Sequence, residues 1–434
     1  MLKVFEREGH PLSNRILVNA DNKPFVYLAD TAWELIHRAT FEEIEFYIRN
    51  RAEKGFTVVT SVILAEFNGL TEPNAYGELP LINGNPNEPN EAYFKVVDFF
   101  VETAEKHGMY AALLPTWGDK VNKKWGQGPE IFTPENAYEY GSFLGERYKN
   151  KPVVWVLGGD RPIETEKHLE VWRALAKGLK EKSRGELLIT YHPMGGHSSS
   201  EWLHDEGWLD FNMVQSGHSE KHLPNYLMIQ RDYSLRPVKP VVEGEARYEN
   251  HPVNWDPSKG RFDAHDVREA AYWAIFSGAC GFTYGCNEVW MMYEPENRPL
   301  TSTWTRHFHP RLRWIDALDV PGASQMKYLR ELLEGRLGLL QPDQTLLLDA
   351  GSGSDYTVAC RAIDESFAMV YVPTGKPFKL NLKTIEGVFD AWWYDPSSGA
   401  RYHAGRCRGK QIIELSPPTS GPLEDWVFIL EHVF

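Results

Sequence analysis

Two stretches of this sequence bring carboxylates to the end of an apolar run, and each has a glycine beside the acid. Residues 152–157 lead into Gly-Gly-Asp160, and residues 240–242 lead into Glu243-Gly-Glu245. Such runs are typical of strands buried on both faces. A pair of carboxylates at two strand ends suits glycosidic bond cleavage, in which one acid protonates the leaving oxygen and the other attacks or stabilises the anomeric carbon.

The roles within this pair follow from position along the strands. Asp160 is the candidate acid/base, and the alternative is an ion pair with Arg161 at the start of a loop. Glu243 and Glu245 are two residues apart, so a regular strand would point both side chains the same way. Glu245 lies farther out, past Gly244, and is the candidate nucleophile. Glu243, one layer deeper, is expected to hold a neighbour such as an arginine. A third possibility is that neither glutamate is catalytic.

The elements that position these acids alternate between apolar runs and amphipathic segments. A typical unit has Thr40 as a helix N-cap, apolar residues at helical spacing and Gly55 as a stop. The expected strands cover residues 24–30, 56–64, 109–117, 152–160, 187–192, 211–218, 240–245 and 281–285. Eight such alternations predict a (β/α)8 TIM barrel over residues 1–340. An open doubly wound sheet is the alternative, although no strand is followed by a glycine-rich phosphate loop.

Beyond residue 340 the pattern changes to short alternating runs separated by Gly, Pro, Ser and Asp. These runs cover residues 346–349, 357–360, 366–372, 378–382, 389–394, 411–415 and 425–430. Regular short strands with turn signals predict a small C-terminal antiparallel β-sandwich domain over residues 341–434.

Barrels of this kind carry their active site at the carboxyl ends of the strands, so polar and aromatic residues there are candidates for substrate binding. Tryptophans can stack on sugar faces, and acids, amides, imidazoles and phenols can bind hydroxyls; packing under loops and loop anchoring are the alternatives. The candidates are Asp30, Trp33, Asn68, Trp117, His192, Gln215, Glu243, Tyr284 and Trp290.

Composition and charge exclude several other classes of function. A formal net charge of −14 without a basic run argues against nucleic acid and anionic membranes as partners. The four cysteines have no metal-type spacing, and we expect reduced thiols. His307 and His309 have the spacing of a first pair of metal ligands, but no further ligand follows nearby, so we expect no metal and no cofactor. With no apolar signal core or long apolar stretch, the expected location is cytoplasmic.

Four segments lie at predicted strand ends: Leu28-Ala-Asp-Thr-Ala-Trp33, Val154-Trp-Val-Leu-Gly-Gly-Asp160, Tyr191-His-Pro193 and Pro240-Val-Val-Glu-Gly-Glu-Ala-Arg-Tyr-Glu249. They resemble the apiosidase-like glycoside hydrolases. The resemblance implies a barrel with its acid/base on the fourth strand and its nucleophile on the seventh, hence Asp160 and Glu245. It also implies a C-terminal β-domain of the kind labelled collagen-binding. The sequence departs from the family where Glu243 replaces an expected aspartate, and where no signal peptide is found, which favours a short imported oligosaccharide or glycoside.

Together these features predict a glycosidase that cleaves plant-type oligosaccharides or glycosides by a two-carboxylate mechanism with retention of configuration. The alternative is a catalytically inactive, sugar-binding barrel whose β-domain recruits a partner or a glycan. The sequence makes no prediction about the oligomeric state.

Overall fold

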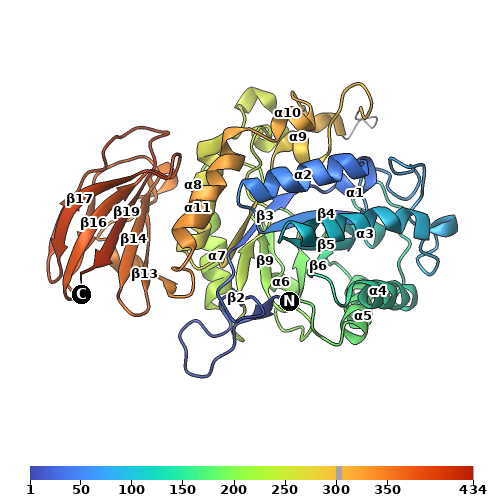
Figure 1. The fold of residues 1–434 in the computed structure, drawn as a ribbon, viewed down its shortest axis with the longest axis horizontal. Coiled ribbons are helices and arrows are strands. Elements are labelled where there is room, and N and C mark those ends of the chain that lie inside the picture. Colours follow the sequence, from blue (N-terminus) through green and yellow to red (C-terminus); the bar gives the residue numbers. More distant parts are fainter. Residues whose placement is uncertain (300–304, 434) are drawn as a thin grey trace.

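Eight parallel strands form the barrel in the computed structural model, which describes residues 1–299 and 305–433 (Figure 1). The strands are β3 (Tyr27–Thr31), β4 (Val58–Leu64), β5 (Tyr110–Thr116), β6 (Val153–Gly158), β7 (Ile189–His192), β9 (Asn212–Gln215), β10 (Val241–Glu243) and β11 (Gly281–Tyr284). They follow the order β7-β6-β5-β4-β3-β11-β10-β9, and the short β8 (His197–Ser198) pairs antiparallel with β9. Between β7 and β9, Asp210 N donates to Ile189 O (2.8 Å) and Thr190 Oγ1 to Phe211 O (2.7 Å). The predicted barrel is confirmed.

Helices surround this barrel, and one of them begins at the N-cap predicted from the sequence, Thr40. They are α1 (Leu35–Arg38), α2 (Phe41–Glu53), α3 (Glu91–Lys106), α4 (Pro134–Tyr148), α5 (Glu166–Lys182), α6 (Ser200–Leu203), α7 (Asn225–Ser234), α8 (Ala264–Phe276), α9 (Asn287–Trp290), α10 (Trp314–Ala317) and α11 (Pro321–Leu333). Thr40 closes a capping box on α2, and Thr133 does the same on α4. None of the helices in the described part of the chain combines the length and the apolar character needed to cross a bilayer.

The barrel strands divide their side chains between two cores. On β6, Val154 and Val156 pack inside the barrel, whereas Trp155 and Leu157 pack outward against the helices. This alternation follows from the two-residue period of a strand. It matters for the site, because a polar residue just past a strand end reaches the barrel mouth only if it continues on the inner side.

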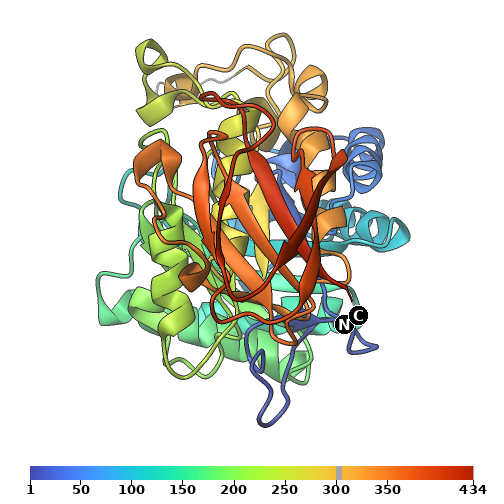
Figure 2. The same ribbon diagram turned by 90° about the vertical axis from the view of Figure 1, so that its left-hand side faces the viewer.

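Antiparallel sheets make up the C-terminal domain. The strands are β12 (Leu340–Pro342), β13 (Val358–Ala362), β14 (Phe367–Val372), β15 (Phe378–Asn381), β16 (Val388–Tyr394), β17 (Arg401–Arg408), β18 (Ile412–Leu415) and β19 (Trp426–His432). Six form one sheet in the order β12-β13-β14-β19-β16-β17, and β15 pairs with β18. Figure 2 shows the molecule from the side of the C-terminal domain, where the six-stranded sheet covers one flank of the barrel.

Two expectations for this domain need correction. Residues 346–349 were expected to form a strand, but a 3-10 helix (Gln344–Leu346) precedes a single bridge between Leu347 and Leu380. The edge strand β17 was not predicted, because its side chains are largely exposed and polar and therefore lack the alternation of a half-buried strand.

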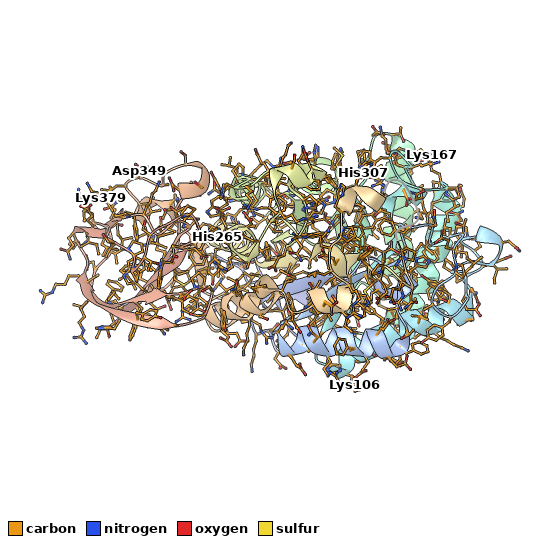
Figure 3. The ribbon with its side chains drawn as sticks, turned by 90° about the horizontal axis from the view of Figure 1, so that it is seen from above. Lys106, Lys167, His265, His307, Asp349 and Lys379 are labelled. Atoms are coloured by element: carbon orange, nitrogen blue, oxygen red, sulfur yellow. The ribbon has the colours of Figure 1, made fainter. Side chains whose placement is uncertain are left out.

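The six-stranded sheet packs on α8 and α11, and polar contacts tie the two parts together. Arg268 of α8 forms a double hydrogen bond with Asp425 (3.0 and 2.6 Å). The rings of Tyr272 and Tyr371 stack with centroids 4.8 Å apart. His265, which lies between the barrel and the sheet in Figure 3, has Nε2 within 2.8 Å of Pro373 O. We infer a largely rigid junction.

Replacing Asp425 with Ala should destabilise the protein by about 3 kcal/mol, because the change leaves the buried Arg268 guanidinium without its carboxylate. Asp390→Ala is the matched control, since its partner Arg406 is 64% exposed and such pairs are worth at most about 1 kcal/mol. Urea denaturation of both variants measures the difference. Equal losses in the two variants would show that the junction does not depend on this ion pair.

Candidate active site

Asp160 follows β6, and the two residues before it have backbone conformations that favour glycine. Gly158 has φ 83° and Gly159 has φ 118°, both in the region that favours glycine. A Cβ on Gly158 would lie 2.4 Å from His192 O, and one on Gly159 would lie 2.6 Å from Gly118 N. The glycines therefore allow close approach of neighbouring backbone.

Three side chains contact the Asp160 carboxylate. Arg161 Nη1 donates to Oδ2 (3.0 Å), Gln215 Nε2 to Oδ1 (3.3 Å), and Trp125 Nε1 lies 3.4 Å from Oδ2. Burial raises the pKa of Asp160, the Arg161 charge opposes this rise, and the nearby Glu245 carboxylate adds to it. The ion pair with Arg161 therefore exists alongside an environment that favours the protonated acid.

Glu245 is held by hydrogen bonds that favour its ionised form. His192 Nε2 lies 3.2 Å from Oε2 and His218 Nε2 lies 2.9 Å from Oε1. Tyr248 N donates to His218 Nδ1 (3.4 Å), which leaves Nε2 of His218 as the donor to Glu245. Burial alone would raise the pKa of Glu245, but the hydrogen bonds from the two histidines outweigh it and hold the pKa below the usual range.

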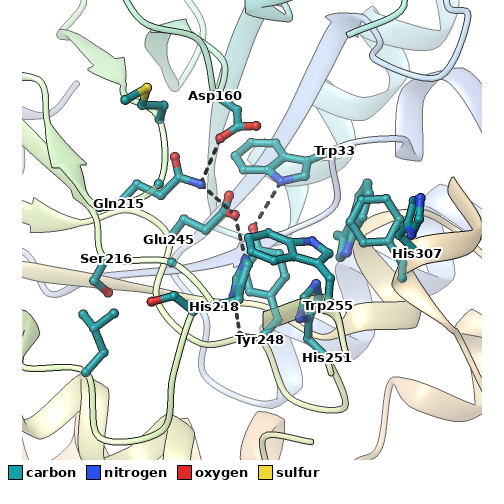
Figure 4. A pocket seen from close by; sticks show the side chains of 18 of the residues that line it. Trp33, Asp160, Gln215, Ser216, His218, Glu245, Tyr248, His251, Trp255 and His307 are labelled. Atoms are coloured by element: carbon teal, nitrogen blue, oxygen red, sulfur yellow. Dashed lines mark hydrogen bonds and ion pairs between the residues drawn. The ribbon is translucent and has the colours of Figure 1, made fainter. Parts of the chain in front are cut away.

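One amide group joins the two carboxylates. Gln215 Nε2 donates to Asp160 Oδ1 (3.3 Å) and to Glu245 Oε1 (3.0 Å), as the dashed lines of Figure 4 show. These two oxygens therefore cannot be farther apart than the sum of the two distances. The pKa values of the two acids are shifted in opposite directions within one site, which is the arrangement that separates a proton donor from an ionised carboxylate.

A cavity of about 900 Å³ opens over the pair at the mouth of the barrel. Trp33, Trp117 and Trp290 line its inner part and are only 3%, 3% and 4% exposed. Trp33 Nε1 donates to Tyr248 Oη (3.2 Å), and the ring of Trp33 lies 5.1 Å from that of Trp117. The cavity thus has aromatic walls around two carboxylates, which suits a sugar ring with apolar faces and polar edges.

Some of the predicted site residues line this cavity. They are Trp33, Trp117, Asp160, Gln215, Glu245 and Trp290. His192 stands behind Glu245 and packs edge-on against Trp33, with centroids 5.2 Å apart. It therefore contacts the candidate nucleophile rather than the cavity.

Three other predicted residues do not line the cavity. Asp30 is fully buried on the outer side of the barrel, where it accepts hydrogen bonds from Tyr47 and from Arg51 Nε (2.7 Å). Tyr284 donates to Glu249 Oε2 (2.7 Å) on the same side. Asn68 donates to Glu72 Oε1 (3.0 Å) in a loop. Each position favours a structural contact over the substrate-binding role assigned from the sequence.

Glu243 also lies outside the cavity, and its partners differ from the expected arginine. It accepts hydrogen bonds from Ser216 N (3.1 Å) and from Asn225 Nδ2 (3.2 Å). Burial raises its pKa to about 7, against the opposing effect of these hydrogen bonds. Glu243 and Glu245 do not point the same way, because β10 ends at Glu243 and the strand alternation stops there.

Several residues that line the cavity were not predicted from the sequence. Tyr248 and His251 follow Glu245 by only a few positions, so their closeness in sequence to this acid could have marked them as site residues. Trp125 and Trp255 stand at the exposed mouth, at 46% and 42% exposure, and come from long loops without a sequence pattern. His307 also lines the cavity, but the described residues contain no cluster of three His, Cys, Asp or Glu side chains that could hold a metal.

Comparison with known proteins agrees with this geometry. A family model described as "Apiosidase-like, catalytic domain" matches residues 12–338. The chain belongs to the apiosidase-like family. A second model, described as "Putative collagen-binding domain of a collagenase", matches residues 341–431. A search of curated proteins found no match.

Solved structures extend the likeness of this apiosidase-like chain over nearly its whole length. A glycoside hydrolase family 5 protein from Bacteroides vulgatus ATCC 8482 is 29% identical, with a TM-score of 0.87 over 96% of this chain and 92% of that one. A structure titled "Glycoside hydrolase" is also 29% identical, with a TM-score of 0.88 over 99% and 97% of the two chains. An endo-β-1,4-mannanase from Thermotoga petrophila, 14% identical with a TM-score of 0.51 over 91% and 92%, shares the fold. The protein is a glycosidase.

A third carboxylate, Glu66, lines the cavity of this apiosidase-like barrel. Its Oε1 lies 3.3 Å from Arg161 Nη2, so Arg161 is shared between Glu66 and Asp160. Burial raises the pKa of Glu66 to about 8, although the Arg161 charge opposes this and the Asp160 charge adds to it. Glu66 is therefore mainly protonated at neutral pH, and above it the ionised carboxylate shares Arg161 with Asp160.

This shift predicts the pH dependence of a Glu66→Gln variant. The folded state holds the Glu66 proton more tightly than the unfolded state does. The carboxyl group therefore destabilises the fold progressively as the pH rises from the usual pKa of a glutamate to about 8. The variant should match the wild type near pH 5 and melt at least about 2 °C higher at pH 9. Thermal melts at both pH values test this. A variant that melts lower than the wild type at pH 9 would mean that the Glu66–Arg161 ion pair is stabilising.

Proposed function

We propose that the protein hydrolyses plant-type oligosaccharides or glycosides with retention of configuration, with Glu245 as nucleophile and Asp160 as acid/base. The observation that carries this proposal is the single Gln215 amide nitrogen that donates to both carboxylates. Glu245 is biased toward the ionised form and Asp160 toward the protonated form. These are the states that the first step of a retaining glycosidase requires.

In the first step, the Glu245 carboxylate attacks the anomeric carbon and forms a C–O bond to the sugar. The glycosidic C–O bond breaks, and its electron pair stays on the leaving oxygen, which takes the proton of Asp160. The products are a glycosyl ester on Glu245, a free alcohol and an ionised Asp160. Arg161, within 3.0 Å of Asp160 Oδ2, stabilises the charge that Asp160 gains.

In the second step, water takes the place of the departed alcohol. The Asp160 carboxylate removes a proton from this water as its oxygen attacks the anomeric carbon, and the ester bond to Glu245 breaks. Glu245 returns to its ionised state, which His192 and His218 stabilise by hydrogen bonds at 3.2 and 2.9 Å. Two displacements at one carbon restore the original configuration.

The spacing of the acids supports retention. Their nearest oxygens are bounded by the two Gln215 contacts of 3.3 and 3.0 Å. This bound is compatible with the separation of about 5–5.5 Å between the carboxyl groups of retaining enzymes.

A hydrolysis screen tests the proposed function. It would cover aryl glycosides and plant oligosaccharides, and the description of the matching family as apiosidase-like makes apiosides the first members of the panel. The double variant Asp160→Asn, Glu245→Gln serves as the blank. Release of sugar by the wild type and not by the blank is the expected result. Equal release, or binding heat without release of sugar from any member, would contradict the proposal.

The cysteines support a location in a reducing compartment such as the cytoplasm. Cys280, Cys286, Cys360 and Cys407 are all free thiols, and the first three are buried. Secreted proteins more often use their cysteines in disulfides. Cell fractionation with an antibody would test this proposal, and recovery from the medium would contradict it.

A further inference from the structure

We propose that Trp125 forms the leaving-group subsite, on which the first ring of the departing sugar or aryl aglycone stacks. This inference rests on the proposed function and adds to it the residue that recognises the leaving group. It follows from where Trp125 stands relative to the acid, from the free face of its ring, and from the way its loop is anchored.

The first observation is the position of Trp125 beside Asp160. Its Nε1 lies 3.4 Å from Asp160 Oδ2, the same oxygen that Arg161 contacts at 3.0 Å. A general acid must lie within hydrogen-bond reach of the oxygen that it protonates. The leaving group therefore passes beside Asp160, and Trp125 is the exposed aromatic residue at that point.

The second observation is the exposure of the indole ring. The Arg161 guanidinium lies over the ring at 4.7 Å from its centroid and so covers one face. The side chain is nevertheless 46% exposed. One face of a large apolar ring is thus backed by a buried cation, and the other is available to a ligand.

The third observation is that the loop carrying Trp125 is held in place. Gly128 N donates to Asp119 Oδ2 (2.8 Å), and Asp119 is itself fully buried in an ion pair with Lys120 (2.7 Å). A Cβ on Gly126 would lie 2.4 Å from Asp119 Cβ and 2.6 Å from Arg161 Nη2. The ring is therefore preorganised, which lowers the entropic cost of stacking a ligand on it.

The inner walls of the cavity have a different character. They include Trp33, Trp117 and Trp290, each less than 5% exposed. Its exposed ring therefore distinguishes Trp125 from these three tryptophans.

Trp255 is a matched control for Trp125. It is 42% exposed and lines the same cavity, but it packs edge-on against His218 and His251, with centroids 6.0 and 5.5 Å away. It therefore stands on the Glu245 side of the site. Its removal should change the hydrolysis of substrates with small and large leaving groups by the same factor.

The experiment compares two substrates that share the sugar identified in the screen: its methyl glycoside and a disaccharide in which a second sugar replaces the methyl group. Both have alkyl leaving oxygens, so they differ mainly in whether a ring is present to stack. Trp125→Ala should lower kcat/KM for the disaccharide about tenfold, chiefly through KM, and that for the methyl glycoside less than about threefold. Trp125→Phe, which keeps a face but lacks the N–H, should retain most of the preference for the disaccharide.

The possible outcomes separate the two proposals. If Trp125→Ala changes both substrates alike, or neither, while the wild type hydrolyses both, the leaving-group subsite is wrong and the proposed function stands. The subsite is equally wrong if Trp255→Ala shows the selective loss instead. If the wild type hydrolyses no glycoside at all, the proposed function fails and this inference fails with it.

Discussion

Glu245→Gln is expected to lower kcat at least about a thousandfold while leaving the fold intact, because an amide cannot form the glycosyl ester. The glutamine has nearly the same size and still offers one oxygen acceptor to His192 or His218, which now contact different oxygens of the carboxylate at 3.2 and 2.9 Å. Steady-state kinetics on the most active glycoside of the screen measure the loss. A circular dichroism melt confirms that the variant is folded.

Glu243→Gln is the matched control, since it makes the same change two residues earlier. Glu243 lies outside the cavity, and glutamine can keep an acceptor for Ser216 N. Its kcat should stay within about threefold of the wild type, because no contact with substrate is lost. Loss of activity in Glu243→Gln with activity retained in Glu245→Gln would show that the nucleophile has been misassigned.

Asp160→Asn is expected to have the second largest effect, and its size should depend on the leaving group. For an alkyl glycoside, kcat/KM should fall about 10²- to 10⁴-fold, because the leaving oxygen no longer receives a proton. A 4-nitrophenyl glycoside leaves without that proton, so its first step should be much less affected. Comparing the two substrates separates lost acid catalysis from general damage to the site, which would slow both equally.

The same variant should also change the pH profile. The raised pKa of Asp160 keeps the acid protonated to higher pH, and the lowered pKa of Glu245 keeps the nucleophile ionised to lower pH. The wild-type profile of kcat/KM should therefore be bell-shaped, with activity lost at high pH as Asp160 ionises. Asp160→Asn should lack this high-pH limb. Its persistence in the variant would assign the acid to another residue.

The sequence was most informative where the strand period continues to the rim. On β6, Val154 and Val156 face the barrel interior, and Asp160 continues that side after two glycines. The same test explains a residue that was misplaced. Leu28 packs outside the barrel, so Asp30, two positions later, also faces outward and meets Arg51 instead of the cavity.

Other parts of the site could not be predicted, because tertiary contacts decide them. The position of Trp125 depends on a loop held by Asp119 and Lys120, and neither residue signals this contact in the sequence. The choice between Glu243 and Glu245 depended on where β10 ends, and strand ends are the least certain feature of a sequence pattern. The residues at strand ends could therefore be predicted in part, whereas the residues on loops were found only in the structure.

Trapping the glycosyl-enzyme would show whether Glu245 is the nucleophile. A 2-deoxy-2-fluoro glycoside of the sugar identified in the screen, with an activated leaving group, should form the ester and hydrolyse slowly enough for peptide mass spectrometry. One added sugar is expected on the peptide that contains Glu245, with fragmentation placing it on that residue. A sugar on Glu243, or the absence of a covalent adduct from an enzyme that turns the substrate over with inversion, would contradict it.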